Sequence, residues 1–198
     1  MTDKLENYYE NYNYGQRKPV YIKESELRED QKQRLIQSDN FCIIPWIHMH
    51  AFPDGRAYPC CLSEPDYPIG NLRNQTMREV WNDAPYKNMR VRMLADKDCK
   101  ECTKCYEQER SGLFSMRNSA NKNFGHLIGL VDDTKEDGTY EDFKLRYYDI
   151  RFSNICNFAC RTCGSIFSSS WHRDEVAAGW DPKHPVFMYA GKDKNDMW

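Results

Sequence analysis

The sequence is poor in three features that would assign the protein to a common class. Its 198 residues include no apolar run close to the roughly 18 residues of a membrane span. Residues 1–20 hold no apolar stretch of the kind that signal peptides carry. Neither sign of charge dominates, because the formal net charge is −2, whereas nucleic-acid surfaces are usually strongly basic. We therefore expect a cytoplasmic protein that binds neither membranes nor nucleic acid.

The chain also lacks a fourth cysteine next to its last three. The chain has 9 cysteines, an odd number that cannot pair fully, and cytoplasmic thiols stay reduced. The last three are Cys156, Cys160 and Cys163, and no cysteine follows them. A closed zinc site and an ordinary iron–sulfur cluster each take four protein ligands. The fourth position is therefore filled from elsewhere, by His172 in a zinc site for example, or is left open for chemistry.

Changes in composition divide the chain into four segments. The first is a tyrosine-rich arm that ends in a predicted helix, the second holds six cysteines, the third is an acidic linker, and the last holds the other three cysteines. Their bounds are 1–39, 40–130, 131–144 and 145–198. We expect the second and fourth segments to be separate metal-binding units.

Local patterns predict the elements of the first two segments. Ser25 is predicted to cap a helix over 25–39, and Thr76 and Asp83 to cap two short helices. An apolar and polar alternation that breaks at Pro53-Asp54-Gly55 predicts a β-hairpin.

The rest of the chain is predicted to hold a helix over about 105–121, a strand over 145–152 and a helix over 165–179. The last three cysteines fall in the loop between this strand and the helix after it. The order of strand, cysteine loop and helix is the most informative pattern in the sequence.

This pattern resembles the defining motif of the radical S-adenosylmethionine superfamily, a C-x3-C-x2-C loop after the first strand of a (β/α) barrel. The resemblance implies a [4Fe–4S] cluster held by Cys156, Cys160 and Cys163, with one open iron that binds S-adenosylmethionine. Reduction then breaks the cofactor's C–S bond and yields a 5′-deoxyadenosyl radical. Thr162 stands where the family often has an aromatic residue against the adenine, so it is an expected cofactor contact. The family's Gly-Gly-Glu segment is absent.

The earlier cysteines resemble a second kind of site. Cys42, Gly55 and Cys60 form a C-x12-G-x4-C pattern around the predicted hairpin, and C-x2-C spacing follows near residue 100. This arrangement is similar to the auxiliary-cluster modules called SPASM and to their shorter form, the twitch domain. The resemblance implies a second [4Fe–4S] cluster. Its expected ligands are Cys42, Cys60, Cys102 and Cys105.

Several alternatives remain open at this point. Cys61 competes with Cys60 as a ligand, and Cys99 competes with Cys105. A ferredoxin run fails because Glu109 occupies the position of its last cysteine. A zinc ribbon uses the same C-x2-C turns.

Two histidines share one face of the predicted hairpin. His48 and His50 are two residues apart, and side chains at that spacing point the same way from a strand. They are predicted to be ligands, substrate contacts or ordinary half-buried residues of an amphipathic strand.

Together these observations predict an α+β or α/β chain. A small cysteine-rich hairpin-and-helix module precedes the first βα unit of a radical S-adenosylmethionine barrel, and the chain resembles a truncated fragment of such a protein. The expected function is a radical enzyme that acts on an unspecified peptide or small molecule, with flavodoxin or ferredoxin as electron donor. The alternative is a non-catalytic iron–sulfur or zinc protein for electron transfer or interaction.

Overall fold

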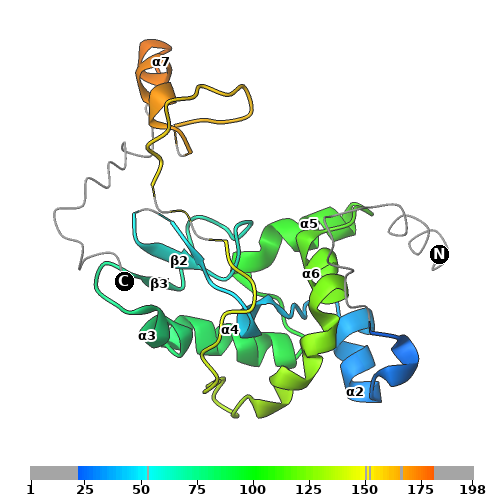
Figure 1. The fold of residues 1–198 in the computed structure, drawn as a ribbon. Helices are drawn as coiled ribbons and strands as arrows, with labels where there is room; N and C mark the ends of the chain where they lie inside the picture. Colours follow the sequence, from blue (N-terminus) through cyan, green and yellow to red (C-terminus); the bar gives the residue numbers. More distant parts are fainter. Residues whose placement is uncertain (1–21, 53, 150, 152, 166, 181–198) are drawn as a thin grey trace.

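The computed structural model describes residues 22–52, 54–149, 151, 153–165 and 167–180, so the expected arm before residue 22 lies outside them. Short helices surround one small antiparallel sheet in this part of the chain (Figure 1). The strands are β1 (His50–Ala51), β2 (Arg56–Tyr58) and β3 (Gly70–Asn71), in the order β1-β2-β3. The helices are α2 (Glu29–Lys32), α3 (Met77–Trp81), α4 (Ala84–Leu94), α5 (Thr103–Arg110), α6 (Met116–Phe124) and α7 (His172–Ala177).

The predicted hairpin is confirmed by the pairing of β1 with β2, in which His50 lies opposite Tyr58. Its turn depends on Gly55, which has a φ of 88° and lies against the next segment of chain. A Cβ at this position would lie 2.7 Å from Cγ of Arg73. Glycine therefore satisfies both the backbone conformation and the close approach.

Two predicted helix starts are also confirmed. The Thr76 hydroxyl accepts a hydrogen bond from Glu79 N at 3.2 Å and begins α3. The Asp83 carboxylate accepts one from Ala84 N at 2.7 Å and begins α4. Both side chains satisfy backbone donors that have no partner within the helix itself.

The predicted cap at Ser25 is wrong. Ser25 lies inside a separate 3₁₀ turn, Glu24–Glu26, and α2 begins only after Arg28. The 3₁₀ turn closes through a hydrogen bond from Leu27 N to Glu24 O, which ends it before α2. From α2 the helix continues into a π-helical turn, Gln33–Gln37, so the helical prediction is confirmed over a shorter range.

The helix predicted over about 105–121 is two helices. Gly112 has a φ of 77°, which ends α5, and Ser115 begins α6. The Ser115 hydroxyl accepts from Asn118 N at 3.1 Å, while Ser115 N donates to Asn118 Oδ1 at 3.0 Å. A left-handed glycine followed by a capping serine stops one helix and starts the next.

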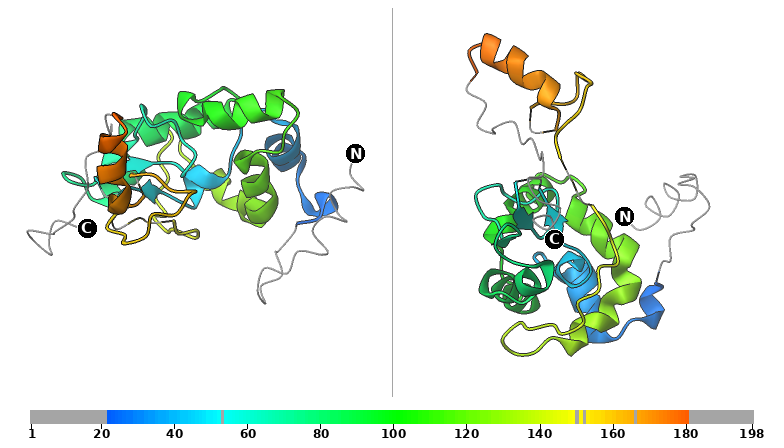
Figure 2. Two further views of the ribbon diagram at one scale, coloured as in Figure 1. Left: turned by 90° about the horizontal axis from the view of Figure 1, so that it is seen from above. Right: turned by 60° about the vertical axis from the view of Figure 1, so that its left-hand side comes forward.

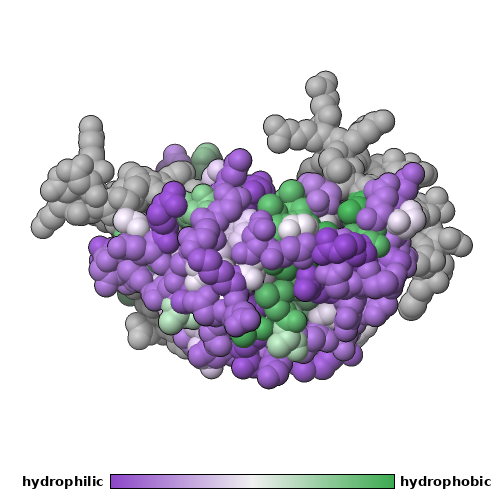
Figure 3. All heavy atoms as spheres, turned by 90° about the horizontal axis from the view of Figure 1, so that it is seen from below, coloured by the Kyte–Doolittle hydropathy of each residue, from purple (hydrophilic) through white to green (hydrophobic). Residues whose placement is uncertain are grey.

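The core lies between the sheet, α3, α4 and α6. Its largest fully buried members are Trp46, Trp81, Arg90, Tyr58, Tyr86, Tyr140, Phe41, Ile43, Ile47, Met49, Ile69 and Met89. One face of the molecule is mostly hydrophilic, with small separate hydrophobic areas (Figure 3). Apolar burial therefore holds the helices and the short strands together.

The segment 131–144, expected to be an acidic linker, packs into this core along part of its length. Tyr140 is 0% exposed, and the Trp81 indole donates to Tyr140 O at 3.1 Å. Gly138 has a φ of 84° and approaches the backbone of Lys87 so closely that a side chain would collide with it. The segment therefore packs against the core through Tyr140, although most of the neighbouring residues are polar.

The strand predicted over 145–152 is wrong for the residues that the structure describes there. Arg146 N and Tyr147 N both donate to Ile47 O, at 2.7 and 3.2 Å, and Arg151 N donates to Ala51 O at 3.3 Å. The segment thus runs beside β1 without forming a regular ladder. The carbonyls of Tyr147 and Asp149 face histidine side chains in place of backbone donors, as described below.

The predicted final helix is confirmed only in part. A 3₁₀ turn, Ser169–Trp171, leads into α7, which ends at Ala177. Two views show α7 and the preceding loop standing away from α2 to α6 (Figures 1 and 2). Arg151 lies at their junction, with its guanidinium 5.2 Å from the ring centre of Phe52 and 4.4 Å from that of Phe167.

Candidate metal centre

Four cysteine side chains approach one another from three parts of the fold. Cys42 precedes the 3₁₀ turn Ile44–Trp46, and Cys60 follows β2. Cys102 is the N-cap of α5, and Cys105 lies in the first turn of that helix. Side chains three residues apart share one face of a helix, so Cys102 and Cys105 point to the same side.

The thiols of Cys42, Cys60 and Cys102 have raised pKa values, and neighbouring cysteines contribute to each of them. Burial raises the pKa of Cys42, and the neighbouring sulfurs of Cys60 and Cys105 raise it further. Burial also raises the pKa of Cys60, with Cys105 among the contributing neighbours. For Cys102, burial is again the main cause of a raised pKa, and Cys42, Cys60, Cys99 and Cys105 add to it.

This electrostatic coupling has a chemical consequence. Each thiolate that forms at the centre makes the next one less favourable, and burial makes the thiolates of Cys42, Cys60 and Cys102 costly. A bound cationic group would remove this cost, because metal-coordinated thiols are deprotonated outright. The arrangement is therefore suited to a metal centre and poorly suited to free thiolates.

The two competing cysteines face other groups. The Cys61 thiol interacts with Asp149 and Arg151 as well as with Cys60, and burial raises its pKa to about 11. The buried Cys99 thiol is directed at backbone carbonyls, 3.8 Å from Met89 O and 3.9 Å from Lys97 O. Burial is the main cause of its raised pKa of about 12.

The donor set is compatible with two kinds of metal centre, because zinc ions and [4Fe–4S] clusters are both held by four cysteines. Among the described residues, no group of three or more His, Cys, Asp or Glu side chains is found in a position to hold a metal ion.

The later cysteines lie in a loop whose backbone is held by the residues after it. Ser170 Oγ donates to Cys156 O at 2.6 Å, and the Trp171 indole donates to Cys160 O at 3.1 Å. Ser168 Oγ donates to Phe158 O at 2.6 Å. These hydrogen bonds involve only backbone carbonyls of the loop. They do not involve the cysteine thiols.

The side chains of this loop are open to solvent. Cys160 and Thr162 are exposed, whereas Cys156 and Cys163 are half-buried. His172, the alternative fourth zinc ligand, begins α7, and its buried Nδ1 has no hydrogen-bond partner among the described residues. The loop belongs to the same region in which no single-ion site is found.

His48 and His50 are docking residues for the segment after the linker. His48 Nδ1 lies 2.9 Å from Tyr147 O, and His50 Nδ1 lies 3.0 Å from Asp149 O. Because a carbonyl oxygen only accepts, Nδ1 is the protonated nitrogen in both rings. Burial lowers the pKa of both histidines, and the buried Nε2 of each has no hydrogen-bond partner among the described residues.

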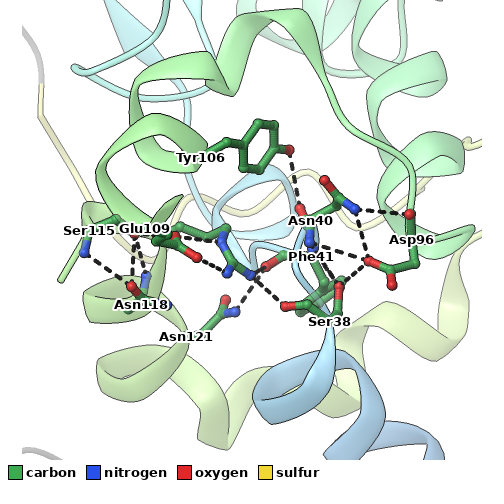
Figure 4. Close-up of polar contacts among 10 residues, drawn as sticks. Ser38, Asn40, Phe41, Asp96, Tyr106, Glu109, Ser115, Asn118 and Asn121 are labelled. Atoms are coloured by element: carbon green, nitrogen blue, oxygen red, sulfur yellow. Dashed lines mark hydrogen bonds and ion pairs between the residues drawn. The ribbon is translucent and has the colours of Figure 1, made fainter. Parts of the chain in front are cut away.

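Polar residues of α5 and α6 also support the centre, and sequence reasoning did not find them. Arg117 and Asn121 donate to backbone carbonyls just before Cys42, and Glu109 accepts from Arg117. Figure 4 shows Glu109 and Asn121 near Ser38 and Phe41. Charged and amide residues on a short helix usually face solvent, so composition gives no signal for their burial. Only the four-residue spacing of Arg117 and Asn121 places both on one helix face.

Comparison with known families assigns the first metal-binding segment. Residues 42–106 match the family model of SPASM, an iron–sulfur cluster-binding domain. The match begins at Cys42 and includes the hairpin and the first turn of α5. The protein therefore contains a SPASM iron–sulfur cluster-binding domain, as the resemblance predicted. No curated protein and no solved structure matches the chain significantly.

The structure also bears on the membrane prediction. Within the described residues, none of the helices combines the length and the apolar character needed to cross a membrane.

Proposed function

We propose that the protein is a radical S-adenosylmethionine enzyme with an auxiliary [4Fe–4S] cluster in its SPASM domain. The observation that carries the proposal is the convergence of Cys42, Cys60, Cys102 and Cys105 from separate elements. The match to an iron–sulfur cluster-binding family supports it independently. Cys61 and Cys99 are excluded from the proposed ligand set because their sulfurs interact with Asp149 and with backbone carbonyls, respectively.

The proposed auxiliary centre is partly shielded from water, since Cys60 and Cys102 are half-buried. Cys42 and Cys105 are buried, and Tyr86 lies close enough to Cys42, Cys60 and Cys102 for their charges to raise its pKa further after burial. The Tyr86 hydroxyl is occupied, since it donates to His48 O at 2.6 Å. Proteins set the reduction potential of such a centre by excluding water from it and by placing hydrogen bonds near it.

The second centre is proposed for Cys156, Cys160 and Cys163. Its three thiolates would leave one iron of the cluster without a protein ligand and open to the amino and carboxylate groups of S-adenosylmethionine, and exposed Thr162 lies beside them. A reduced cluster held there would supply the one electron needed for reductive cleavage of the C–S bond of S-adenosylmethionine. Ser168, Ser170 and Trp171 hold the loop backbone in place through its carbonyls. The proposed partners are a flavodoxin or ferredoxin and a peptide or small-molecule substrate.

The proposal is tested by anaerobic reconstitution of the full chain with iron and sulfide. Two cubane clusters predict about eight iron and eight sulfide per chain. S-adenosylmethionine is then added to the reduced protein while the electron paramagnetic resonance signal is followed. We expect a changed signal that Cys160→Ala abolishes and the matched variant Cys61→Ala retains. Stoichiometric zinc without sulfide, or a signal that S-adenosylmethionine leaves unchanged, would contradict the proposal.

A further inference from the structure

A buried arginine on α6 lies behind the first ligand segment. Arg117 is 6% exposed, and its Nη1 donates to Ser38 O at 2.9 Å and to Phe41 O at 3.0 Å. Phe41 O belongs to the peptide bond that leads into Cys42. The guanidinium therefore holds the backbone on one side of this cysteine.

Asn121, one helical turn after Arg117, completes the contact. Its Nδ2 donates to Phe41 O at 2.9 Å (Figure 4), and its Oδ1 accepts from Ile43 N at 2.9 Å. The peptide groups before and after Cys42 are thus both bound by α6. This helix lies outside the segment that matches the SPASM family model.

Glu109 connects the same arginine to the helix that carries two other cysteines. Arg117 Nε donates to Glu109 Oε1 at 2.8 Å, and Nη2 pairs with Glu109 Oε2. Glu109 lies on α5, one turn after Cys105. Arg117 therefore links the Cys42 segment to α5 through a two-bond ion pair, which fixes orientation as well as distance.

The two members of this pair carry opposite charges, and the positive member acts on Cys42. Arg117 lies close enough to Cys42 to favour a negative charge on its sulfur. Buried charges are weakly screened, and one-electron reduction makes an iron–sulfur cluster more negative. A positive neighbour therefore favours the reduced state, and the Glu109 carboxylate offsets part of that effect.

We propose that Arg117 is a positioning residue that orients Cys42 toward the auxiliary cluster and raises the cluster's reduction potential, with Glu109 setting the size of the effect. The proposal rests on the function proposed above, because it concerns the cluster bound by Cys42, Cys60, Cys102 and Cys105. It predicts that Arg117 and Glu109 move the potential in opposite directions.

The test measures the midpoint potential of the auxiliary cluster in the full chain by redox titration with paramagnetic resonance detection. Cys156, Cys160 and Cys163 are changed to Ala in every sample, so that only this cluster contributes. We expect Arg117→Met to lower the potential, Glu109→Gln to raise it, and Arg117→Lys to lie between Arg117→Met and the parent. Arg110→Met, which removes an exposed charge from the end of α5, should leave the potential close to that of the parent.

Shifts of the same sign in Arg117→Met and Glu109→Gln would overturn the proposal, as would an equal shift in Arg110→Met. If Arg117→Met fails to retain a cluster, Glu109→Gln and Arg117→Lys decide by the signs of their shifts. A parent that binds no iron or sulfide refutes the proposed function and this inference together. If the parent binds the cluster but neither Arg117→Met nor Glu109→Gln changes its midpoint potential, only this inference is refuted.

Discussion

His50 and Asp149 join the SPASM domain to the segment that leads into the second cysteine loop. His50 Nδ1 lies 3.0 Å from Asp149 O and 3.2 Å from the Asp149 carboxylate, and the histidine ring is 0% exposed. His48 makes the equivalent contact with Tyr147 O. Two histidines with a spacing of two residues therefore bind two carbonyls with the same spacing, which aligns the segment along β1.

The first prediction is a loss of stability in mildly acidic solution. Because burial lowers the folded-state pKa of His48 and His50, the unfolded chain binds more protons below the ordinary histidine pKa of about 6.5. Stability should then decrease as the pH falls through about 6.5 toward the folded pKa values, by up to about 1.4 kcal/mol per pH unit for each histidine. Asp149 opposes this effect at both rings, whereas Arg151 reinforces it at His50.

Urea unfolding between pH 7 and pH 5 measures this slope. His48→Asn combined with His50→Asn keeps an N–H donor near the position of Nδ1 but removes both titrations, so the slope should become shallower. His126→Asn, at an exposed position, serves as the control. A double variant with an undiminished slope would show that other groups cause the pH dependence.

The second prediction separates neighbouring cysteines. Cys60→Ala should lower the iron content of the reconstituted protein by about four per chain, because it removes a ligand of one cubane. Cys61→Ala should retain that iron, since the Cys61 thiol interacts with Asp149 and Arg151. Iron and sulfide analysis of the two variants, prepared side by side without oxygen, is the measurement. Equal losses in both would refute the proposed ligand set.

The third prediction concerns Arg90, a cation that is 0% exposed. Its Nε donates to Pro45 O at 3.1 Å, and its Nη1 donates to Asn82 Oδ1 and Gly138 O, both at 3.2 Å. Arg90→Met would leave these buried acceptors without a donor, and we expect a destabilisation of about 2–4 kcal/mol.

Urea unfolding followed by tryptophan fluorescence tests this prediction, because Trp81 packs against the Arg90 guanidinium at 4.7 Å from its ring centre. Arg92→Met, two residues along α4 with a side chain that is 40% exposed, is the matched control and should cost below about 1 kcal/mol. Similar losses of unfolding free energy in both variants would show that the buried hydrogen bonds of Arg90 do not contribute more than an exposed arginine does.

The fourth prediction concerns the turn at Gly138. Gly138→Ala combines a positive φ with a collision against Lys87 O, so we expect a destabilisation of about 2 kcal/mol or more. Gly112→Ala has a similar φ of 77° but meets nothing within 4 Å, so it isolates the cost of the backbone conformation. The difference between their unfolding free energies measures the collision. A difference near zero would mean that the segment moves away from α4 without cost.

Local features were determined by the sequence itself. The hairpin turn depends on the φ freedom of Gly55, and the starts of α3 and α4 depend on hydrogen bonds from Thr76 and Asp83 to nearby backbone. These interactions involve residues within a few positions of one another, so the sequence pattern contains their full description. The cysteine spacing around the hairpin likewise predicted the SPASM domain that the family comparison shows.

The tertiary structure alone decided which side chains face the centre. Cys60 and Cys61 are adjacent in sequence, and only packing of the hairpin against α5 and the Asp149 segment gives them different neighbours. The burial of Arg117 and the contacts of His48 and His50 also depend on residues far away in the chain. The spacing of residues in the sequence limits which side chains lie on the same face of a helix or strand. Contacts with distant parts of the chain decide whether those side chains meet other cysteines, a backbone carbonyl or solvent.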